Sequence, residues 1–516
     1  MKLESFVCGR WSAGQGAGRP LVNATTGAVI ATADATGIDI TAAVDFARRR
    51  GKALGQLSFA QRGALLKSIA EVLQANRDAY NGIARENSGN TKLDASVDID
   101  GAIGTLRYYS RLVAGLGDAR AILEVGKDQL GRDPAFIARH IWSTRPGVAV
   151  HVNAFNFPAW GLWEKVAVAI LAGVPSVAKP ATATALLSQA MVKNVIEAGA
   201  LPEGALSLIV GPVDGLARRL GAMDALAVTG SAQTAALLRR EVAECPEPPR
   251  LTIEADSINA TLLGPDVAPG SPLWELCLAE ARKALMVKAG QLCTNIRRIM
   301  APRAHAGKFA EALGALASAL TVGDPADAAT QVGPLINRAQ RDEANKHIEA
   351  LSAEARVVAR AKLPDASAES GFVAPVLLHC DKPAEARLIH EVEVFGPCAT
   401  ILAYDSLAQA TEMVARARGS LAASLFSSDT SVQDEVIGQL APWHGRVLIV
   451  DESVGKAHTG HAIVMPQCVH GGPGRAGGGE ELGGLRGLRL YMQRTALQAS
   501  TAVSDRLEKS CATAQL

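Results

Sequence analysis

One cysteine in the second half of the chain has the neighbours expected of a nucleophile. Cys293 follows the segment Gly290-Gln291-Leu292. Glycine lets the backbone approach its surroundings closely, the Gln291 amide can brace the loop, and Cys293 is the only strong nucleophile of the segment. On these residues alone an inert core thiol is the stronger interpretation, because free cysteine is among the most buried residue types. A catalytic interpretation requires an oxyanion stabiliser, a base and an electron acceptor elsewhere in the chain.

The other cysteines and histidines show no pattern of cross-links or metal ligands. The eight cysteines are scattered without a Cys-x-x-Cys pair, which argues against a disulfide framework and against a structural zinc site. His458 and His461 are three residues apart, but no third ligand stands at a suitable spacing. We therefore expect no metal.

The composition indicates an ordinary globular protein with more than one domain. A chain of 516 residues with 48% hydrophobic residues exceeds the size at which a single core keeps growing. Lys and Arg number 52 against 51 Asp and Glu, so no net field favours nucleic acid or an anionic membrane. The N-terminus lacks the pattern of a signal peptide, and no apolar run is long enough to span a bilayer. We expect a soluble, cytoplasmic protein without nucleic-acid or membrane partners.

The elements that must position the chemistry begin with a region of alternating strands and helices. Residues 38–87 have the spacing of paired surface helices, and residues 121–143 suit a β-hairpin. The alternation after this hairpin predicts a doubly wound parallel sheet that binds ligands beyond the carboxyl ends of its strands. No Gly-x-Gly-x-x-Gly fingerprint occurs, so an ordinary Rossmann dehydrogenase is disfavoured. The expected strands are 148–152, 176–178, 206–210 and 225–228, and the expected helices are 163–172, 186–198 and 213–220.

A second α/β set follows residue 251 and carries the thiol. The glycine-rich run 470–479 is expected to be a loop over a site or a linker, because it suits neither a helix nor a regular strand. Residues 488–496 are a strand candidate, and residues 504–516 are expected to form a polar, weakly ordered tail. The strands expected in this half are 261–263, 299–300, 400–402 and 447–450, with a helix at 305–320.

Six short motifs occur in order along the chain: Asn156-Phe157-Pro158, Lys179-Pro180, Thr229-Gly230-Ser231, Glu254, Gly290-Gln291-Leu292-Cys293 and Glu393-Val394-Phe395-Gly396-Pro397. Each is weak alone, but the ordered set resembles the aldehyde dehydrogenase superfamily over about residues 20–500. The resemblance implies an α/β fold with two doubly wound lobes and a β-hairpin oligomerisation element. The implied domains are a dinucleotide-binding domain (1–120 and 144–253), a catalytic domain (254–484), an oligomerisation element (121–143 and 485–503) and a tail (504–516).

The resemblance also implies an NAD(P)-dependent oxidation of an aldehyde to an acid. A Cys293 thiolate would attack the aldehyde carbon, although an ordinary thiol with a pKa of about 8.5 is only a few per cent ionised at neutral pH. The family assigns the Asn156 amide and the Cys293 N–H to the oxyanion, and Glu254 to activation of the water that hydrolyses the thioester. Taken alone, Asn156 could simply form the turn before Pro158, and Glu254 could be a solvated carboxylate at the end of a strand.

The cofactor residues favour NADP. Lys179 follows a strand and could meet the adenosine ribose or its phosphate. NAD-preferring relatives commonly carry a glutamate three residues after this lysine, where it would repel a 2′-phosphate; here the position is Thr182. We therefore expect NADP as the preferred acceptor and NAD as a weaker one. Glu393 and Phe395 resemble the family's nicotinamide-ribose acceptor and the ring beside the nicotinamide, and the other cofactor candidates are Gly211, Thr229, Gly230 and Ser231.

Three positions depart from the commonest family pattern. Phe155 replaces the tryptophan usual before Asn-Phe-Pro, and Met286 replaces an aromatic residue four positions before Gly290. Ala255-Asp256-Ser257 stands after Glu254, where two glycines are common. The loss of those glycines could restrict the swing of Glu254.

The run 470–484 resembles a branch of the family that acts in aromatic degradation. It is similar to the aldehyde dehydrogenase part of the bifunctional phenylacetate ring-opening enzymes, and to the stand-alone semialdehyde dehydrogenase of aerobic benzoyl-CoA degradation. Because the chain ends at Leu516 without a hydratase-like domain, the stand-alone form fits better. The implied substrate is a CoA-linked aldehyde, 3,4-dehydroadipyl-CoA semialdehyde, and the implied assembly is a homodimer, with a tetramer as the alternative. A CoA-acylating enzyme and a catalytically silent scaffold remain alternatives, and Glu254 favours water over CoA as the acyl acceptor.

Overall fold

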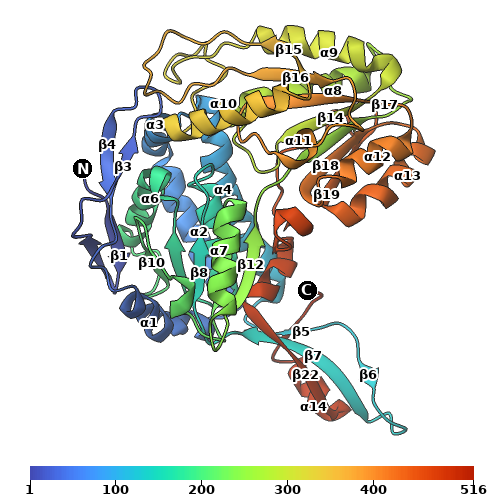
Figure 1. The fold of residues 1–516 in the computed structure, drawn as a ribbon. Helices are drawn as coiled ribbons and strands as arrows, with labels where there is room; N and C mark the ends of the chain where they lie inside the picture. The colour runs from blue at the N-terminus through green and yellow to red at the C-terminus, as the bar shows by residue number, and fades with distance from the viewer.

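A computed structural model describes all residues, 1–516, and shows two lobes with an arm that projects away from them (Figure 1). The first lobe is built on a seven-stranded sheet in the order β12-β11-β8-β9-β10-β1-β2. The five strands from β12 to β10 are parallel, and β1 and β2 extend the sheet beyond β10 as antiparallel strands. The strands are β1 (Glu4–Val7), β2 (Arg10–Ala13), β8 (Ala149–Val152), β9 (Ser176–Lys179), β10 (Leu206–Leu208), β11 (Ala225–Thr229) and β12 (Arg250–Glu254).

The strand order of this sheet defines where a ligand can bind. The chain passes from β8 to β9 and β10 in one direction, and then returns to place β11 and β12 on the other side of β8. Ligands of doubly wound sheets bind at such a reversal, beyond the carboxyl ends of the strands. The reversal lies between β8 and β11, so residues after Val152 and Thr229 face the expected site.

Helices cover this sheet largely as expected. The predicted helices at 163–172 and 186–198 are confirmed as α5 (Trp160–Ala172) and α6 (Ala185–Glu197). The helix predicted at 213–220 is wrong: only a single 3-10 turn, η4 (Ala217–Arg219), forms there. Gly215 adopts a left-handed φ of 62° in this segment, which interrupts a helix before it can propagate. The other helices of this lobe are α1 (Ile40–Arg50), α2 (Phe59–Ala75), α3 (Arg77–Ser88), α4 (Lys92–Leu112) and α7 (Ala232–Ala243).

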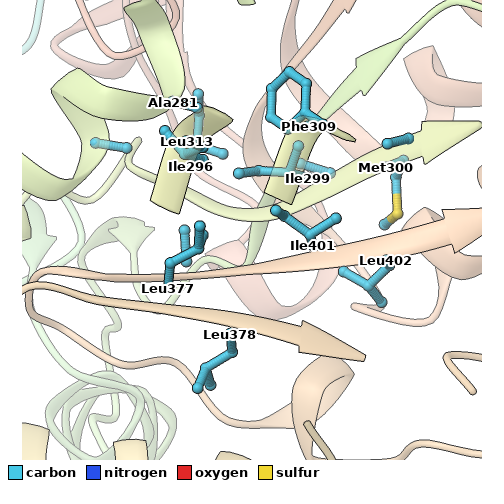
Figure 2. Close-up of a cluster of buried hydrophobic side chains, with 14 of the residues drawn as sticks. Ala281, Ile296, Ile299, Met300, Phe309, Leu313, Leu377, Leu378, Ile401 and Leu402 are labelled. Atoms are coloured by element: carbon cyan, nitrogen blue, oxygen red, sulfur yellow. The ribbon is translucent and has the colours of Figure 1, made fainter. Parts of the chain in front are cut away.

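The second lobe is a seven-stranded sheet in the order β15-β16-β17-β14-β13-β18-β19, parallel except for the edge strand β15. Figure 2 shows its core, where Ile299, Ile401 and Leu377 from the strands meet Phe309 and Leu313 from helix α9. The elements are β13 (Asn259–Leu263), β14 (Ile296–Pro302), β15 (Arg356–Arg360), β16 (Val376–Cys380), β17 (Cys398–Tyr404), β18 (Ser420–Phe426), β19 (His444–Val450), α8 (Pro272–Met286), α9 (Arg303–Ser318), α10 (Arg338–Ser352), α11 (Leu388–Glu391), α12 (Leu407–Ala415) and α13 (Thr430–Leu440).

The projecting arm joins two distant parts of the chain. Strand β22 (Met492–Ser500) pairs antiparallel with β7 (Phe136–Thr144) along its whole length. The strand expected at 488–496 therefore begins and ends four residues later. Its first expected residues belong instead to the 3-10 helix η8 (Gly484–Leu490), which follows the positive φ angles of Gly483 and Gly484. The smaller elements of the arm are β5 (Ile122–Leu123), β6 (Asp128–Gln129), α14 (Thr501–Leu507) and β23 (Ala512–Thr513).

The expectation of a weakly ordered C-terminal tail is wrong. Residues 501–507 form α14, and Ala512 pairs in parallel with Ile122 of β5. Leu516 is only 2% exposed, because it packs into the core of the first lobe. Burial of Leu516 and pairing with the free edge of β5 thus give a defined structure to a segment whose composition is polar.

The glycine-rich run is also more regular than expected. Its ends form an antiparallel pair, β20 (Val469–Gly471) and β21 (Glu480–Leu482). Between them the backbone lies directly against β12: Gly479 N–H donates to the Ile253 carbonyl across 3.0 Å, and a Cβ at Gly477 would stand 2.3 Å from the same oxygen. The glycines are therefore required by close backbone packing, and this packing places β20 beside the carboxyl end of β12. A short two-stranded sheet, β3 (Arg19–Val22) and β4 (Val29–Ala33), completes the fold. None of the helices combines the length and the hydropathy that a membrane span requires.

Candidate active site

Cys293 lies just after a turn with an unusual backbone. The 3-10 segment η5 (Val287–Gly290) ends in three successive left-handed residues, Lys288, Ala289 and Gly290, with φ of 50°, 49° and 72°. Non-glycine residues in this region cost about 1–2 kcal/mol each, so the surrounding structure must hold them. The Asp94 carboxylate accepts from Lys288 N–H at 2.7 Å, and a Cβ at Gly290 would stand 2.2 Å from the Gly396 carbonyl oxygen. The glycine before the thiol is therefore required by both conformation and space.

Side-chain amides and an arginine hold the rest of this turn. Gln291 donates from Nε2 to the Lys288 carbonyl at 3.0 Å, which confirms its expected bracing role. Asn259 donates to the Cys293 carbonyl at 2.9 Å, and Arg297 donates to the Leu292 carbonyl at 3.1 Å. The carbonyl groups around the thiol are thus occupied, which holds the backbone from which the Cys293 side chain projects.

The structure brings Cys293, Asn156 and Glu254 into one cavity, although they come from three different segments. Asn156 follows β8, Glu254 is the last residue of β12, and Cys293 precedes β14. The cavity lies between the two lobes, since its walls come from α5 and β12 of one and from the thiol turn of the other. Its lining consists of Val97, Ala154, Asn156, Phe157, Trp160, Gly161, Glu164, Thr229, Glu254, Leu292, Cys293, Thr294, Ala462, Ile463, Val464 and His470.

The Asn156 amide is oriented by the thiol turn itself. Its Nδ2 donates to the Gln291 carbonyl at 3.0 Å, and its side chain is buried. An amide nitrogen carries two hydrogens, so the second remains for another acceptor. The backbone N–H of Cys293 donates to no other backbone carbonyl. Two hydrogen-bond donors are therefore available at the cavity that contains Cys293.

Glu254 lies beside His470, the first residue of the glycine-rich run, whose role the sequence pattern does not reveal. His470 Nε2 is 2.8 Å from Glu254 Oε2 and 4.0 Å from Cys293 Sγ. Glu254 is 3% exposed, and its second oxygen, Oε1, has no hydrogen-bond partner. Burial raises the pKa of this carboxyl, but the charge and hydrogen bond of His470, joined by the charge of Lys165 and a hydrogen bond from the Cys293 thiol, outweigh burial and hold it at about 2. The carboxylate thus stays ionised with one oxygen available.

The same carboxylate acts against ionisation of the thiol. Burial and then the negative charge of Glu254 raise the pKa of Cys293 well above its ordinary value. The thiol is therefore protonated in this arrangement and can hydrogen-bond Glu254. Ionisation requires that the proton leaves for a base, or that a positive charge or bound ligand offsets the carboxylates.

A buried ionic cluster behind the cavity was also missed from the sequence. Lys165 Nζ lies 2.7 Å from Glu481 Oε2 and donates to Thr229 Oγ1 at 2.8 Å, and it is 3.6 Å from Glu164. Burial raises the pKa of Glu164 to about 7. The available signal was the pair Glu164-Lys165 inside the otherwise apolar helix α5, because adjacent buried charges there need partners.

The segment after Glu254 is tied down at each residue. Ala255 N–H donates to the Ala476 carbonyl at 2.9 Å, and Asp256 accepts from Ala232 N–H at 2.7 Å. Ser257 Oγ accepts from Leu421 N–H at 2.8 Å. This segment, which replaces the two glycines common in relatives, is therefore part of the contact between β12, α7 and the second lobe.

The first group of cofactor candidates lies beyond the carboxyl ends of β9 and β11. Lys179 Nζ bonds only the neighbouring Pro180 carbonyl, at 3.0 Å, and burial lowers its pKa to about 8. Thr182 begins the 3-10 turn η3 (Thr182–Thr184) just after it. A half-buried ammonium without a carboxylate partner fits the hydroxyls or phosphate of an adenosine ribose.

The residues after β11 suit a dinucleotide phosphate. Thr229 and Gly230 lead into Ser231, which is the N-cap of α7 and accepts from Thr234 N–H. A helix N-terminus of this kind favours anions. Gly211, after β10, has φ of 103°, and a Cβ there would stand 2.7 Å from the Asp34 backbone, so packing against Asp34 already requires glycine at this position.

The third group of cofactor candidates approaches the cavity from the second lobe. Glu393 accepts from Ser257 N–H at 3.1 Å and lies 3.3 Å from Arg297, and burial raises the pKa of its carboxyl to about 7. Phe395 packs edge-on against Phe155 with ring centroids 5.5 Å apart. Phe155, which stands where a tryptophan is usual, thus forms an aromatic pair with Phe395, the residue expected beside the nicotinamide.

Comparison with known proteins assigns the class. The model of the aldehyde dehydrogenase family matches residues 11–496. The chain therefore belongs to the aldehyde dehydrogenase family, and it is an NAD(P)-dependent aldehyde dehydrogenase. It is 44% identical over 480 residues to the 3,4-dehydroadipyl-CoA semialdehyde dehydrogenase of Aromatoleum evansii, which covers 92% of this chain and 93% of that relative.

Other relatives are more distant. The chain is 42% identical over 169 residues to Protein MaoC of Klebsiella aerogenes, which covers 33% of this chain and 50% of that protein. A betaine aldehyde dehydrogenase structure from Staphylococcus aureus has a TM-score of 0.82 at 22% identity, covering 96% of this chain and 95% of that one. The NAD+ complex of an aldehyde dehydrogenase from Bacillus cereus has a TM-score of 0.83 at 22% identity, with 97% of each chain covered. These structures share the fold, which confirms the expected α/β class.

Proposed function

We propose that this enzyme oxidises 3,4-dehydroadipyl-CoA semialdehyde to the corresponding acid, with NADP as the preferred acceptor. The observation that carries the proposal is the convergence of the Cys293 thiol, the Asn156 amide and the Glu254 carboxylate on one cavity. The relative from Aromatoleum evansii carries the name of this activity and is similar over nearly the whole of both chains.

Each of the three residues has a defined part in the reaction. The Cys293 thiol releases its proton to solvent, its sulfur bonds to the aldehyde carbon, and the Asn156 amide and the Cys293 N–H stabilise the oxyanion. A bound nicotinamide supplies the hydride acceptor, and a thioester on Cys293 results. Glu254 Oε1 then takes a proton from water, whose oxygen bonds to the thioester carbon. The carbon–sulfur bond breaks, the acid leaves, and the thiolate is restored.

The preference for NADP rests on Lys179 and Thr182. The Lys179 ammonium has no carboxylate partner, and Thr182 supplies a hydroxyl rather than a negative charge. Both residues therefore suit a 2′-phosphate. Gly211, Thr229, Gly230 and Ser231 would border the dinucleotide, and Glu393 and Phe395 would contact the nicotinamide ribose and ring.

A second cavity supports a long, unbranched substrate. It has a volume of about 210 Å³ and shares Val97, Leu292, Ala462 and Ile463 with the cavity that contains Cys293. The two cavities therefore adjoin, and the second is lined mostly by hydrophobic residues. A straight semialdehyde chain could lie across both, with its reactive carbon at Cys293.

The test is turnover by the purified enzyme with a panel of aldehydes that includes the CoA-linked semialdehyde, with NAD and NADP compared. We expect the highest kcat/KM with the CoA-linked semialdehyde and NADP, and no need for added CoA. Strict dependence on free CoA would instead support the acylating alternative. Cys293→Ala should lose turnover while it retains NADP binding, and substantial residual activity would contradict the nucleophile assignment.

We also propose that the dinucleotide-binding, catalytic and oligomerisation regions follow the boundaries given above, and that the arm pairs two subunits into a homodimer. The arm is held to the body mainly through its base (Figure 1). It exposes large apolar side chains, Val125 at 64%, Leu130 at 42% and Phe136 at 45%. Apolar groups at these exposures suit a partner surface. Light scattering should give twice the monomer mass, and a monomer would contradict the proposal.

A further inference from the structure

The His470 imidazole is the one cationic group that directly contacts the catalytic carboxylate, and nothing in the proposed reaction uses it. It lies on β20, opposite Glu481 of β21, and only 7% of it is exposed. Its Nε2 faces both Glu254, at 2.8 Å, and Cys293, at 4.0 Å. One ring nitrogen thus serves both reactive groups.

This geometry differs from that of a relay in which histidine takes a proton from the nucleophile. In such a relay the two ring nitrogens divide the work, one facing the carboxylate and the other the nucleophile. Here Nε2 faces both, so a hydrogen on Nε2 that donates to Glu254 leaves no lone pair there to accept the thiol proton. His470 therefore bonds the carboxylate rather than serving as the base for Cys293.

We propose that His470 is a positioning residue that holds Glu254 as a fixed carboxylate, with Oε1 directed to water, and balances the negative charge that appears when Cys293 ionises. This inference rests on the proposed function, because it concerns the same thiol and carboxylate. His470 keeps its own proton throughout and forms no bond to the substrate.

The charges around the pair make this cation necessary. Three carboxylates approach the cavity region from α5, β12 and β21, and Lys165 is shared between two of them. A thiolate at Cys293 would add a further negative charge at low dielectric. Burial lowers the pKa of His470, but the charge and hydrogen bond of Glu254, joined by the charges of Glu164 and Glu481, outweigh burial and raise it, which favours the protonated ring while Glu254 is ionised. The titratable and charged groups that act on Glu254, His470 and Cys293 are Glu164, Lys165, Glu393, Arg446 and Glu481.

The glycine-rich run explains how this histidine reaches the site. Gly471 has φ of 142°, and a Cβ at Gly445 of β19 would stand 1.8 Å from the Gly471 carbonyl oxygen. Gly479 donates to the backbone of β12 one residue before Glu254. The two strands that carry Glu254 and His470 are therefore held together through backbone contacts that side chains would prevent.

The principal test is the pH profile of His470→Gln, which can keep a hydrogen bond but loses the charge. In the wild type the Glu254 carboxylate stays ionised at acidic pH. Without the His470 cation, burial and the neighbouring carboxylates raise the pKa of Glu254. We expect the acid limb of thioester hydrolysis to move to higher pH by at least about one unit, which is about a tenfold loss at a fixed acidic pH. The loss should shrink toward pH 9. His470→Lys, which restores a cation, should move the limb back.

Alkylation of Cys293 by iodoacetamide, followed by mass spectrometry of its peptide, provides a readout that needs no turnover. The midpoint of the alkylation rate against pH should rise in His470→Gln, because the thiolate loses its nearest cation. All measurements should contain EDTA, since the ligand atoms of Glu254, Cys293 and His470 lie within 4.8 Å of one another and a stray divalent ion could bridge them. His379→Gln, which alters a buried histidine on β16 that contacts Arg356, is the matched control.

Two outcomes would overturn the proposal. An unchanged acid limb and an unchanged alkylation midpoint in His470→Gln would show that the cation does not set the state of Glu254 or Cys293. An equal loss of activity at every pH, with alkylation unaffected, would show a merely structural or direct proton-transfer role. A wild type inactive with every aldehyde would instead contradict the proposed function, and the alkylation measurement would still decide the role of His470.

Discussion

Asn156 donates through Nδ2 to the carbonyl oxygen of Gln291 across 3.0 Å, and this bond joins residues 135 positions apart in the chain. It links the loop after β8 in the first lobe to the thiol turn in the second. The bond uses one amide hydrogen and leaves the other free in a side chain that lines the cavity containing Cys293. The same contact therefore connects the lobes and holds the amide that donates to the oxyanion in the proposed reaction.

Replacement of Asn156 by alanine should slow the first chemical step. Loss of one oxyanion donor typically lowers kcat by about 10²–10³-fold. The measurement is the single-turnover rate of NADPH formation, with cofactor affinity measured separately and expected to stay close to that of the wild type. Asn194→Ala, which removes a half-buried amide on α6 bonded to Tyr80, is the control. A rate within twofold of the wild type would contradict the oxyanion assignment.

Glu254→Gln should separate thioester formation from hydrolysis. The amide cannot take a proton from water, so steady-state turnover should fall by about 10²–10⁴-fold, the usual contribution of general base catalysis. Stopped-flow absorbance should still show a burst of reduced cofactor near one equivalent per site, whereas Cys293→Ala should show none. The absence of a burst in Glu254→Gln would mean that this carboxylate is also needed to ionise the thiol.

Thr182→Glu should shift cofactor preference toward NAD. A carboxylate three residues after Lys179 would repel the 2′-phosphate of NADP and could accept from the ribose hydroxyl of NAD. The ratio of kcat/KM with NADP to that with NAD should fall at least about tenfold, the effect of roughly 1.4 kcal/mol. Thr182→Gln has the same size without the charge and is the matched control. If both variants change the ratio equally, size rather than charge decides the preference.

A buried histidine away from the reaction predicts how stability depends on acid. Burial lowers the pKa of His151 on β8 to about 3, so the folded state keeps this ring neutral while the unfolded chain binds a proton near pH 6.5. The contribution of the neutral His151 ring to the free energy of unfolding is therefore fully present above pH 6.5 and is lost as the pH falls below that value. At pH 5 the loss from this one ring is about 2 kcal/mol.

His151→Gln should remove that part of the acid sensitivity. The measurement is the difference in free energy of unfolding by urea between pH 8 and pH 5, at one protein concentration. The difference should be smaller in His151→Gln by about 2 kcal/mol, even if the variant is less stable at both pH values. His305→Gln, on α9, is the control. An unchanged difference would mean that His151 is accessible to protons in the folded state.

The local pattern of the chain was sufficient for much of the fold. Four strands of the first sheet and two of its helices were predicted, because strands and helices of this kind follow from short apolar periods and from glycine or proline at their ends. The helix expected at 213–220 failed for a local reason, the left-handed Gly215. The tail failed for a non-local one, since pairing with β5 and burial of Leu516 depend on a segment almost 400 residues earlier.

The sequence by itself determined the family motifs, and with them Cys293, Glu254 and Asn156, because each motif is a short contiguous string that can be recognised without its partners. Only the tertiary structure decided that His470 contacts Glu254 and that Lys165 joins Glu481. These pairs lie on separate strands and helices, and their distances depend on how glycine-rich backbone packs against β12 and β19. Whether a buried charge is paired is a property of that packing, so the ionisation of the thiol and its carboxylate could be argued only once the strands were in place.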